Sequence, residues 1–325
     1  MDSLEKPLRQ DTDYSANRYE IIERNNRDSF LMNEPSKLDV IHSLHSAGDS
    51  RDFTKKAGEA AFRLILSGNM SPLNSYGPTH LTTEGRIQDA QENVASFLQA
   101  NNIQRDTVRL LAPERDYTTP LTCINLDTAT LEMDDSGLLK TTQKGDFIYT
   151  FNPDIALAAR PADCPVAYIA AETPDGEVSV LLHLAWLGVA HGYVEQAREA
   201  LDTLAVDWNS MQVRLSAGAH AASYKYSNYA SDPRDTFPVS EGLFLDIAQD
   251  PKIAAYSFSI DVAAATYESI LEKWDVTPYQ VFMDTTDTAS AEAGYSSHSR
   301  TFKNYSVGGE NSRDIVIARR ANNAA

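Results

Sequence analysis

The sequence predicts an α/β protein whose strands form mixed β-sheets. Segments with helical spacing alternate with short apolar segments from Glu84 to Arg319, an order typical of folds in which helices and strands interleave. The composition, with 42% hydrophobic and 23% charged residues, is that of a globular protein. A chain of 325 residues is long enough to bury a substantial core, in one large domain or two ordinary ones.

The first predicted helix begins at Glu84 and ends at Asn101–Asn102. Its apolar residues recur at the spacing of one helix face, at Ile87, Ala90, Val94, Phe97 and Leu98. The apolar runs that follow are predicted as strands, over residues 108–111, 147–151, 166–170 and 178–184. The turn sequence Thr-Pro-Asp-Gly separates the last two runs, so we expect neighbouring strands there.

The second half of the chain continues this alternation. A helix is predicted from apolar residues that share one face, at Val194, Ala197, Leu201 and Leu204. A strand over residues 213–215 follows, and Asp261 is placed to cap a helix that continues to Trp274. Two late strands are predicted over residues 281–283 and 315–318.

Residues 1–60 show a weaker pattern and are predicted to be an accessory segment. Residues 18–28 are rich in charge, and the spacing of Leu38, Ile41 and Leu44 indicates a short amphipathic helix. Residues 61–325 are predicted to form one domain, because nothing from Glu84 to Arg319 has the composition of a linker.

The chain is strongly acidic, with 28 basic and 46 acidic side chains and a formal charge of −18. Such a surface repels nucleic-acid phosphates and anionic lipid, so we expect binding to neither. Two cysteines do not suggest a disulfide framework, and residues 1–35 lack the apolar stretch of a signal peptide. The most apolar run, residues 178–194, fits a buried strand leading into a helix better than a membrane span. We therefore expect a cytoplasmic protein.

Cys164 and His183 are the residues best suited to chemistry. Pro165 disfavours a helix at Cys164, which places the cysteine at a strand entrance, and His183 lies near the end of the next strand. Adjacent strands can bring the thiol and the imidazole together, and both groups suit zinc. Asp163 could orient the His183 ring as a hydrogen-bond acceptor. Each residue also has an ordinary explanation, as a buried cysteine, a hydrogen-bonded core histidine and a solvated turn carboxylate.

At these residues the chain resembles the laccase-domain proteins, historically called multicopper polyphenol oxidoreductases and now understood as purine nucleoside phosphorylases. Pro161-Ala-Asp-Cys-Pro-Val166 is similar to the family's Thr-Ala-Asp-Cys-x-Pro-Val segment. His183-Leu-Ala-Trp-Leu-Gly188 is similar to its His-Ala-Gly-Trp-Arg-Gly segment at a strand–helix junction. Weaker similarities extend over about residues 80–319, at Glu92–Val94, Gly218, Tyr226, Asp261–Ala265, Ser297–Arg300 and Arg313.

The resemblance implies a layered sandwich, in which two mixed β-sheets lie between helices. It also implies phosphorolysis of purine nucleosides with adenosine deamination alongside, so a purine nucleoside and phosphate are the expected partners. The implied metal is zinc, with Cys164 and His183 among its ligands, and its task would be to orient and polarise phosphate or water.

Three positions depart from the family pattern. The family's first metal ligand is a histidine in a Gln-x-His-Gly segment, and residues 111–116 read Leu-Ala-Pro-Glu-Arg-Asp instead. Leu187 stands at the arginine of Trp-Arg-Gly, and Asp284–Thr285 stands at a late Cys-Thr pair. Only two of the three metal ligands are matched, so the resemblance implies a weakened site.

Three functional hypotheses remain open. In the first, an active zinc-dependent nucleoside enzyme uses a substitute third ligand, which is Glu114 by its position, with His80 and His220 in reserve. In the second, a degenerate family member serves as a binding or interaction module. In the third, Cys164 is a metal-free nucleophile with His183 as its base and Asp163 nearby. Copper-based oxidation of phenols ranks below these, because a multicopper centre needs many more histidines.

Overall fold

The computed structural model describes most of the chain from residue 83 onward, together with one N-terminal helix. The described ranges are residues 11–32, 65–67, 83–114, 117–161, 163–237, 242–252, 254–290 and 315–320. The short amphipathic helix predicted around Leu38–Leu44 lies outside these ranges, as do His80, Ser297–Arg300 and Arg313.

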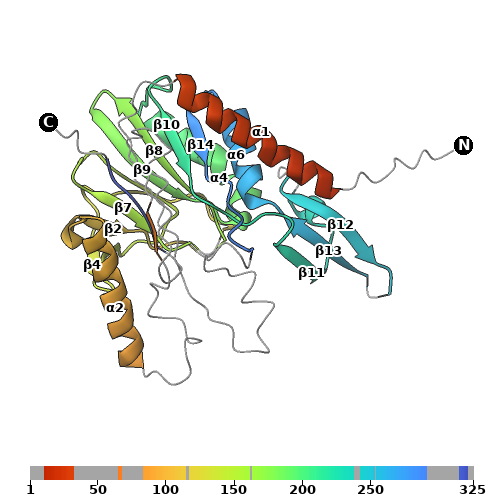
Figure 1. Ribbon diagram of the computed structural model, residues 1–325, viewed down its shortest axis with the longest axis horizontal. Helices are drawn as coiled ribbons and strands as arrows, with labels where there is room; N and C mark the ends of the chain where they lie inside the picture. The colour runs from red at the N-terminus through yellow and green to blue at the C-terminus, as the bar shows by residue number, and fades with distance from the viewer. Residues whose placement is uncertain are drawn as a thin grey trace, which may run out of the picture.

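Two six-stranded sheets form the centre of the molecule (Figure 1). The first has the order β1-β15-β7-β2-β5-β4, with β1 (Ile65–Ser67), β2 (Val108–Leu110), β4 (Leu131–Met133), β5 (Leu139–Thr141), β7 (Ala156–Ala159) and β15 (Ile315–Ala318). The second has the order β14-β10-β8-β9-β6-β3, with β3 (Cys123–Asn125), β6 (Phe147–Thr150), β8 (Val166–Thr173), β9 (Gly176–His183), β10 (Gln212–Leu215) and β14 (Val281–Met283). Both sheets combine parallel and antiparallel pairs, so both are mixed as predicted.

A third, smaller sheet and the helices complete the fold. The third sheet has the order β11-β13-β12, with β11 (Lys225–Tyr229), β12 (Phe244–Asp250) and β13 (Ala255–Ile260). The helices are α1 (Asp11–Met32), α2 (Thr83–Ala100), α3 (Trp186–Ala190), α4 (Tyr193–Thr203), α5 (Pro233–Thr236) and α6 (Val262–Lys273), with a 3-10 turn η2 (Arg105–Thr107). In Figure 1, α2 lies beside the first sheet, whereas α1, α4 and α6 lie beside the second.

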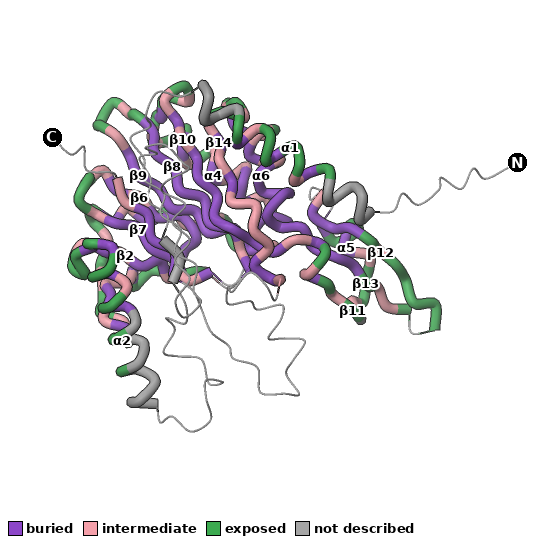
Figure 2. Tube along the Cα trace, viewed as in Figure 1, coloured by how far each residue is buried: buried purple, intermediate pink, exposed green. Residues whose placement is uncertain are grey.

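Three apolar clusters separate the layers, and the buried residues follow the strands (Figure 2). Val94 and Leu98 of α2 pack against the first sheet. The cluster between the two sheets contains Tyr168 of β8, whose hydroxyl donates to the Val316 carbonyl of β15 at 3.0 Å. The far face of the second sheet packs against α4 and α6. The layered sandwich implied by the resemblance is therefore confirmed.

The helices and strands predicted from Glu84 onward are present with bounds within a few residues. The strands over 281–283 and 315–318 coincide with β14 and β15, and Asp261 caps α6 by accepting from the Ala264 amide at 3.3 Å. Three of the strands that were not predicted, β3, β4 and β5, are each three residues long. Such strands are too short to show a period of two.

Helix α1 also went unpredicted, because its buried face is largely polar. It includes the charge-rich residues 18–28, and Arg18 and Asn26 are buried together with Ile22. Asn26 exchanges two hydrogen bonds with the backbone of Met283 in β14, at 2.8 and 3.2 Å. Because β14 is an edge strand, this contact satisfies backbone groups that would otherwise be open to another chain.

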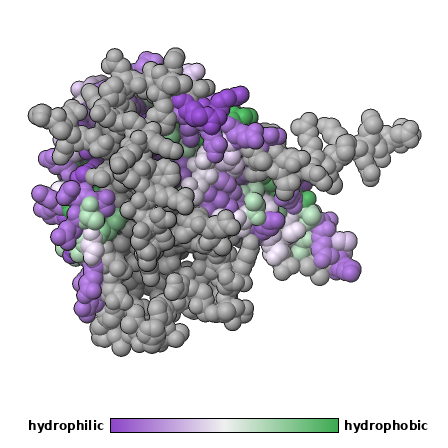
Figure 3. Space-filling model, viewed as in Figure 1, coloured by the Kyte–Doolittle hydropathy of each residue, from purple (hydrophilic) through white to green (hydrophobic). Residues whose placement is uncertain are grey.

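The visible surface is mostly hydrophilic where it is described (Figure 3). Among the described residues, the exposed large hydrophobic side chains are Ile21, Met133 and Tyr279, one in each of three separate parts of the sequence. Single exposed apolar side chains of this kind are normal on a protein surface. No helix in the described ranges combines the length and the apolarity needed to cross a membrane.

Candidate functional site

Cys164 and His183 meet at one end of the β8–β9 hairpin. The two strands pair antiparallel across the Thr173–Gly176 turn, and Val166 lies opposite His183. The Leu184 amide donates to the Pro165 carbonyl at 3.0 Å, so the pairing continues to the residue after Cys164. The Cys164 side chain lies near enough to His183 to contribute to the raised pKa of the imidazole. The predicted juxtaposition on neighbouring strands is confirmed, as is the short helix α3 soon after His183.

His183 is fixed by Asp146, which lies just before β6. Its ring Nδ1 is 2.7 Å from Asp146 Oδ1, and its amide donates to the Asp146 carbonyl at 2.8 Å. Both residues are buried, with 8% of His183 and 1% of Asp146 exposed. The second carboxylate oxygen, Oδ2 of Asp146, is buried with no hydrogen-bond partner among the described residues. Asp146 therefore selects one orientation of the imidazole.

The electrostatics of this pair favour a protonated imidazole when no metal is bound. Burial lowers the pKa of His183, but hydrogen bonds to Asp146 and Cys164 and the charges of both residues outweigh it and raise the pKa to about 10. A metal ligand must be deprotonated, so a metal would have to displace this proton.

Asp163 does not hold His183 and instead anchors the turn that carries Cys164. Its carboxylate accepts from the Thr288 hydroxyl at 3.1 Å, and its carbonyl accepts from the Ala219 amide at 2.9 Å. The prediction that Asp163 orients the imidazole was wrong, because Asp146 occupies Nδ1. The sequence signal for Asp146 was only its place in a Lys-Gly-Asp turn before a strand. Nothing in the sequence identified β6 as the neighbour of β9.

Gly218 is required by the close approach of three segments at this turn. A Cβ at position 218 would lie 3.0 Å from the Ala263 Cβ, 3.2 Å from the Pro165 Cδ and 3.4 Å from the Asp163 carbonyl oxygen. A larger residue would push the turn away from helix α6. The similarity to the family noted at Gly218 therefore has a packing reason.

The half-buried phenol of Tyr117 and the buried phenol of Tyr224 lie within electrostatic reach of Cys164. Burial raises the pKa of Tyr117, and the negative charges of Cys164 and Asp146 raise it further. Burial likewise raises the pKa of Tyr224, with additional contributions from Tyr226 and Cys164. Both phenols therefore remain protonated and can donate hydrogen bonds. Tyr117 follows the segment that replaces the family's histidine, and its pKa responds to the charge of Cys164.

The described residues supply two zinc ligands and not three. No group of three His, Cys, Asp or Glu side chains within the described ranges could hold a metal ion. Glu114 is half-buried and its charge reaches Tyr117, but it does not join Cys164 and His183 in such a group. His220 is stacked on Tyr19 of helix α1 at 3.7 Å. A catalytic zinc normally uses about three protein ligands, so these residues alone do not fit one.

The remaining departures from the family pattern also have positions in the structure. Leu187 lies in α3 and packs against the apolar core, so no guanidinium occupies this place. Asp284 caps a turn, accepting from the Thr286 amide at 2.9 Å and from its hydroxyl at 2.7 Å. Neither position restores what the family pattern would supply.

The sequence matches a family model described as "Multi-copper polyphenol oxidoreductase laccase" over residues 79–310. This range is more than half of the chain and contains Cys164, His183 and Asp146. No curated protein matches the sequence.

Three solved structures share the fold at low sequence identity. YlmD from Geobacillus stearothermophilus is 15% identical with a TM-score of 0.57, over 86% of this chain and 99% of that one. The Bacillus licheniformis hypothetical protein YfiH is 14% identical with a TM-score of 0.53, over 72% of this chain and 81% of that one. A Neisseria meningitidis protein of family DUF152 is 16% identical with a TM-score of 0.53, over 78% and 86%. At these identities the similarity shows the fold alone.

Proposed function

Because the chain belongs to the multi-copper polyphenol oxidoreductase laccase family, we propose that it is an enzyme of purine nucleosides with weakened phosphorylase activity. The observation that carries this proposal is the assembled group of Cys164, His183 and Asp146. Its members come from three places in the chain: Asp146 is hydrogen-bonded to the His183 ring, and Cys164 lies near enough to raise the pKa of that ring.

Phosphorolysis is expected to be slow or absent. It needs a phosphate dianion beside the sugar, and a fixed guanidinium is the usual group that holds one. Leu187 cannot do this, and a third zinc ligand is missing from the described residues. Together these losses should cost several kcal/mol of transition-state stabilisation, on the order of 10³-fold in rate. Adenosine deamination uses water in place of phosphate, so it should be affected less.

Zinc binding, if it occurs, is expected to be weak. Cys164 and His183 would hold the ion, and it would polarise phosphate or water. Two protein ligands bind less tightly than three, and His183 must first lose its proton. Without zinc, the described residues could still supply proton transfer at His183, hydrogen bonding from Tyr117 and Tyr224, and the thiol of Cys164.

A cysteine nucleophile is a second candidate, and one observation favours it. A thiol, a neighbouring imidazole and a carboxylate on the imidazole Nδ1 have the composition of a nucleophile–base–orienter series. In this mechanism the Cys164 sulfur attacks an electrophilic carbon of the substrate after His183 has taken the thiol proton. The same proton then passes to the leaving group.

An assay of inosine and adenosine tests these proposals. Release of free base and of ammonia is measured with and without phosphate, with added zinc and with a chelator. The variants are Cys164→Ala and His183→Ala, and Cys123→Ala is the matched control because Cys123 is the exposed second cysteine on β3. Activity lost in the first two variants and kept in the control supports the proposal.

The other outcomes separate the hypotheses. Activity that survives the chelator and leaves a covalent adduct on Cys164 identifies the cysteine mechanism. Rapid phosphate-dependent release of base would contradict the expectation that phosphorolysis is weak. If neither nucleoside is converted, the remaining hypothesis is that the protein is a binding module. Metal analysis belongs with the assay: zinc content unchanged in both site variants would refute the assignment of Cys164 and His183 as ligands.

A further inference from the structure

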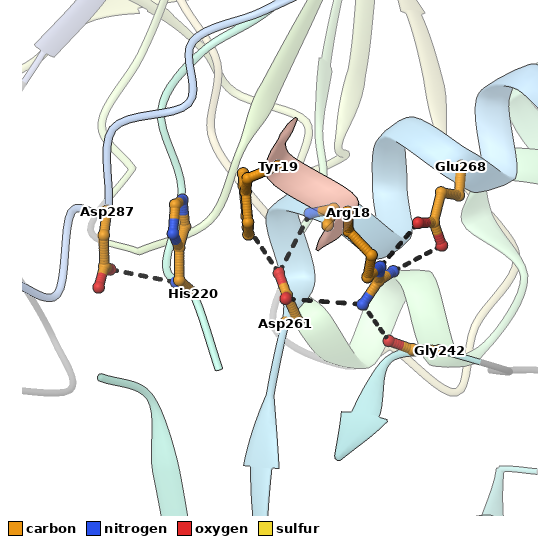
Figure 4. Close-up of polar contacts among 8 residues, drawn as sticks. Arg18, Tyr19, His220, Gly242, Asp261, Glu268 and Asp287 are labelled. Atoms are coloured by element: carbon orange, nitrogen blue, oxygen red, sulfur yellow. Dashed lines mark hydrogen bonds and ion pairs between the residues drawn. The ribbon is translucent and has the colours of Figure 1, made fainter. Parts of the chain in front are cut away.

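Helix α1 is attached to the body of the protein by a buried polar network (Figure 4). The Arg18 side chain is 4% exposed. Its Nε and Nη2 donate to both oxygens of Glu268, at 2.7 and 2.6 Å, and its Nη1 donates to the Gly242 carbonyl at 2.9 Å. Nη1 also lies 3.5 Å from Asp261, which is fully buried. The positive charge that Asp261 meets is therefore supplied by α1.

Tyr19, the next residue of α1, makes two contacts toward the site. Its hydroxyl donates to Asp261 Oδ1 at 2.6 Å. Its ring stacks on the His220 ring with centroids 3.7 Å apart and an angle of 17° between the planes. Figure 4 shows Tyr19 between Asp261 and His220. One side chain thus touches both the start of α6 and the segment that follows β10.

These two contact points converge on Gly218. Asp261 caps α6, and Ala263 in the first turn of that helix is the nearest side chain to Gly218. His220 lies two residues after Gly218, and its amide donates to Asp287 at 3.1 Å. The position of residues 218–220 is therefore set from one side by α6 and from the other by the ring of Tyr19.

Residues 218–220 in turn hold the turn that carries Cys164. Gly218 packs against Pro165 and the Asp163 carbonyl, and the Ala219 amide donates to that carbonyl at 2.9 Å. Cys164 lies between these two contacts. The path from α1 to Cys164 contains only packed or hydrogen-bonded neighbours, all of them described residues.

We propose that Tyr19 and Arg18 are positioning residues for Cys164, and that docking of α1 fixes the Asp163–Pro165 turn. The inference rests on the proposed function only in taking Cys164 as the reactive residue. Without α1, the Asp261 carboxylate loses the Arg18 cation and His220 loses the Tyr19 ring, so residues 218–220 keep only their contacts to Asp163, Asp287 and Thr288 and are held less firmly. The turn at Cys164 then moves with them.

The test measures the mobility of the Asp163–Pro165 turn directly and does not depend on enzymatic activity. Alkylation of Cys164 by iodoacetamide is timed by peptide mass spectrometry in the full chain, with Cys123 as the internal reference. Hydrogen exchange is measured on peptides that cover residues 161–166 and 216–221. The variants are Tyr19→Ala, Tyr19→Phe and Arg18→Ala, with Arg24→Ala as a control at an exposed position of the same helix. Leu201→Ala, in the buried core of α4, is a control for general loss of stability.

Tyr19→Ala and Arg18→Ala are expected to speed alkylation of Cys164 and exchange at Ala219 about tenfold, the factor that corresponds to losing one or two hydrogen bonds. Tyr19→Phe keeps the ring on His220 but loses the hydrogen bond to Asp261, so its rates should lie between those of the native chain and of Tyr19→Ala. Arg24→Ala and Leu201→Ala should leave the ratio of Cys164 to Cys123 alkylation unchanged. Should Tyr19→Ala fail to fold, Tyr19→Leu takes its place.

The proposal would be overturned if Cys164 alkylation and Ala219 exchange in Tyr19→Ala kept their native rates. It would also be overturned if Leu201→Ala changed these rates as much as Tyr19→Ala does, or if Tyr19→Phe changed them as much as Tyr19→Ala does. Because alkylation and exchange do not depend on nucleosides, this result and the nucleoside assay can fail independently.

Discussion

At the residue scale, two buried aspartates near the reactive pair have different tasks. Asp146 binds Nδ1 of His183, and Asp163 binds Thr288 and Ala219. The sequence favoured Asp163 because it is adjacent to Cys164. Asp146 could not be found in this way, since its partner is 37 residues away and the pairing of β6 with β9 is a tertiary fact.

Replacing Asp146 tests this difference. Asp146→Asn is expected to lower zinc affinity roughly 10- to 100-fold, because a carboxylate that orients a ligating imidazole contributes about that much. Competition with a chelating dye measures it. Asp163→Asn is the matched control and should leave the affinity within about twofold, because Asp146 holds the imidazole Nδ1 and an asparagine Oδ1 can still accept from the Thr288 hydroxyl. Equal losses in both variants would mean that the Asp146 contact has no special role.

Leu187 offers a gain-of-function test. An arginine there would place a guanidinium in α3, three residues beyond the strand-end pair of Leu184 with Pro165. Its aliphatic stem can replace the apolar contacts of leucine while the charge reaches outward. Phosphate-dependent release of base should rise on the order of tenfold, since one charge-assisted hydrogen bond is worth about 1.5–3 kcal/mol. Leu187→Met, which adds no charge, should show no increase.

At the scale of elements, the hairpin and the N-terminal helix differ in how well the sequence predicts them. The β8–β9 hairpin was predictable because two apolar runs flank a Pro-Asp-Gly turn, and its end placed Cys164 and His183 together. Helix α1 was not predicted, because among its described side chains Arg18, Tyr19 and Asn26 make the polar docking contacts and Ile22 is the one buried aliphatic residue. Such docking leaves no stripe of apolar residues for a pattern to reveal.

The docking of α1 should respond to acid through His220. Burial lowers the pKa of His220 below its ordinary 6.5, against the opposing charges of Asp287, Asp261 and Asp284. Below about pH 6.5 the unfolded chain therefore binds a proton that the folded chain resists, so the free energy of unfolding falls as the pH falls. The loss is at most about 1.4 kcal/mol per pH unit for one group.

Chemical denaturation at pH 7.5 and 5.5 measures this effect. His220→Phe keeps a ring for Tyr19 to stack on and should show a smaller loss between the two pH values. His191→Phe, at an exposed histidine, is the control and should behave like the native chain. His183, whose pKa is raised to about 10, adds stability as the pH falls from 7.5 toward 6.5, but it does so equally in the native chain and in both variants and therefore cancels in the comparison. An unchanged pH dependence in His220→Phe would contradict the prediction.

At the scale of the whole molecule, the formal charge of −18 acts on any anionic substrate. Phosphate must approach against this field, whereas adenosine is neutral. Added potassium chloride screens the repulsion, so the KM for phosphate should fall roughly two- to threefold between about 20 and about 200 mM salt. The KM for adenosine in deamination is the control and should not change. A KM for phosphate that rises with salt would point to a local basic site that the net charge conceals.

The fold class and the layered architecture could be predicted from the sequence. Alternating elements predicted an α/β protein, and the motif similarity around Cys164 and His183 implied two sheets between helices. The order of strands in each sheet could not be predicted from the sequence. Neighbouring strands such as β2 and β7, or β10 and β14, are separated by long segments of the chain. The third sheet could not be predicted either, because the pairings of β11 and β12 with β13 contain register shifts that break the period of two.

The β8–β9 hairpin also bears on how the site comes into being during folding. Cys164 and His183 are only 19 positions apart, and eight consecutive residue pairs connect Val166–Thr173 with Gly176–His183. Closing so short a loop costs little chain entropy, and hairpins form within microseconds. The thiol and the imidazole can thus meet before the distant strands and helix α1 assemble around them. A nascent chain would then carry the Cys164 thiol already beside an imidazole before the later elements have packed around it.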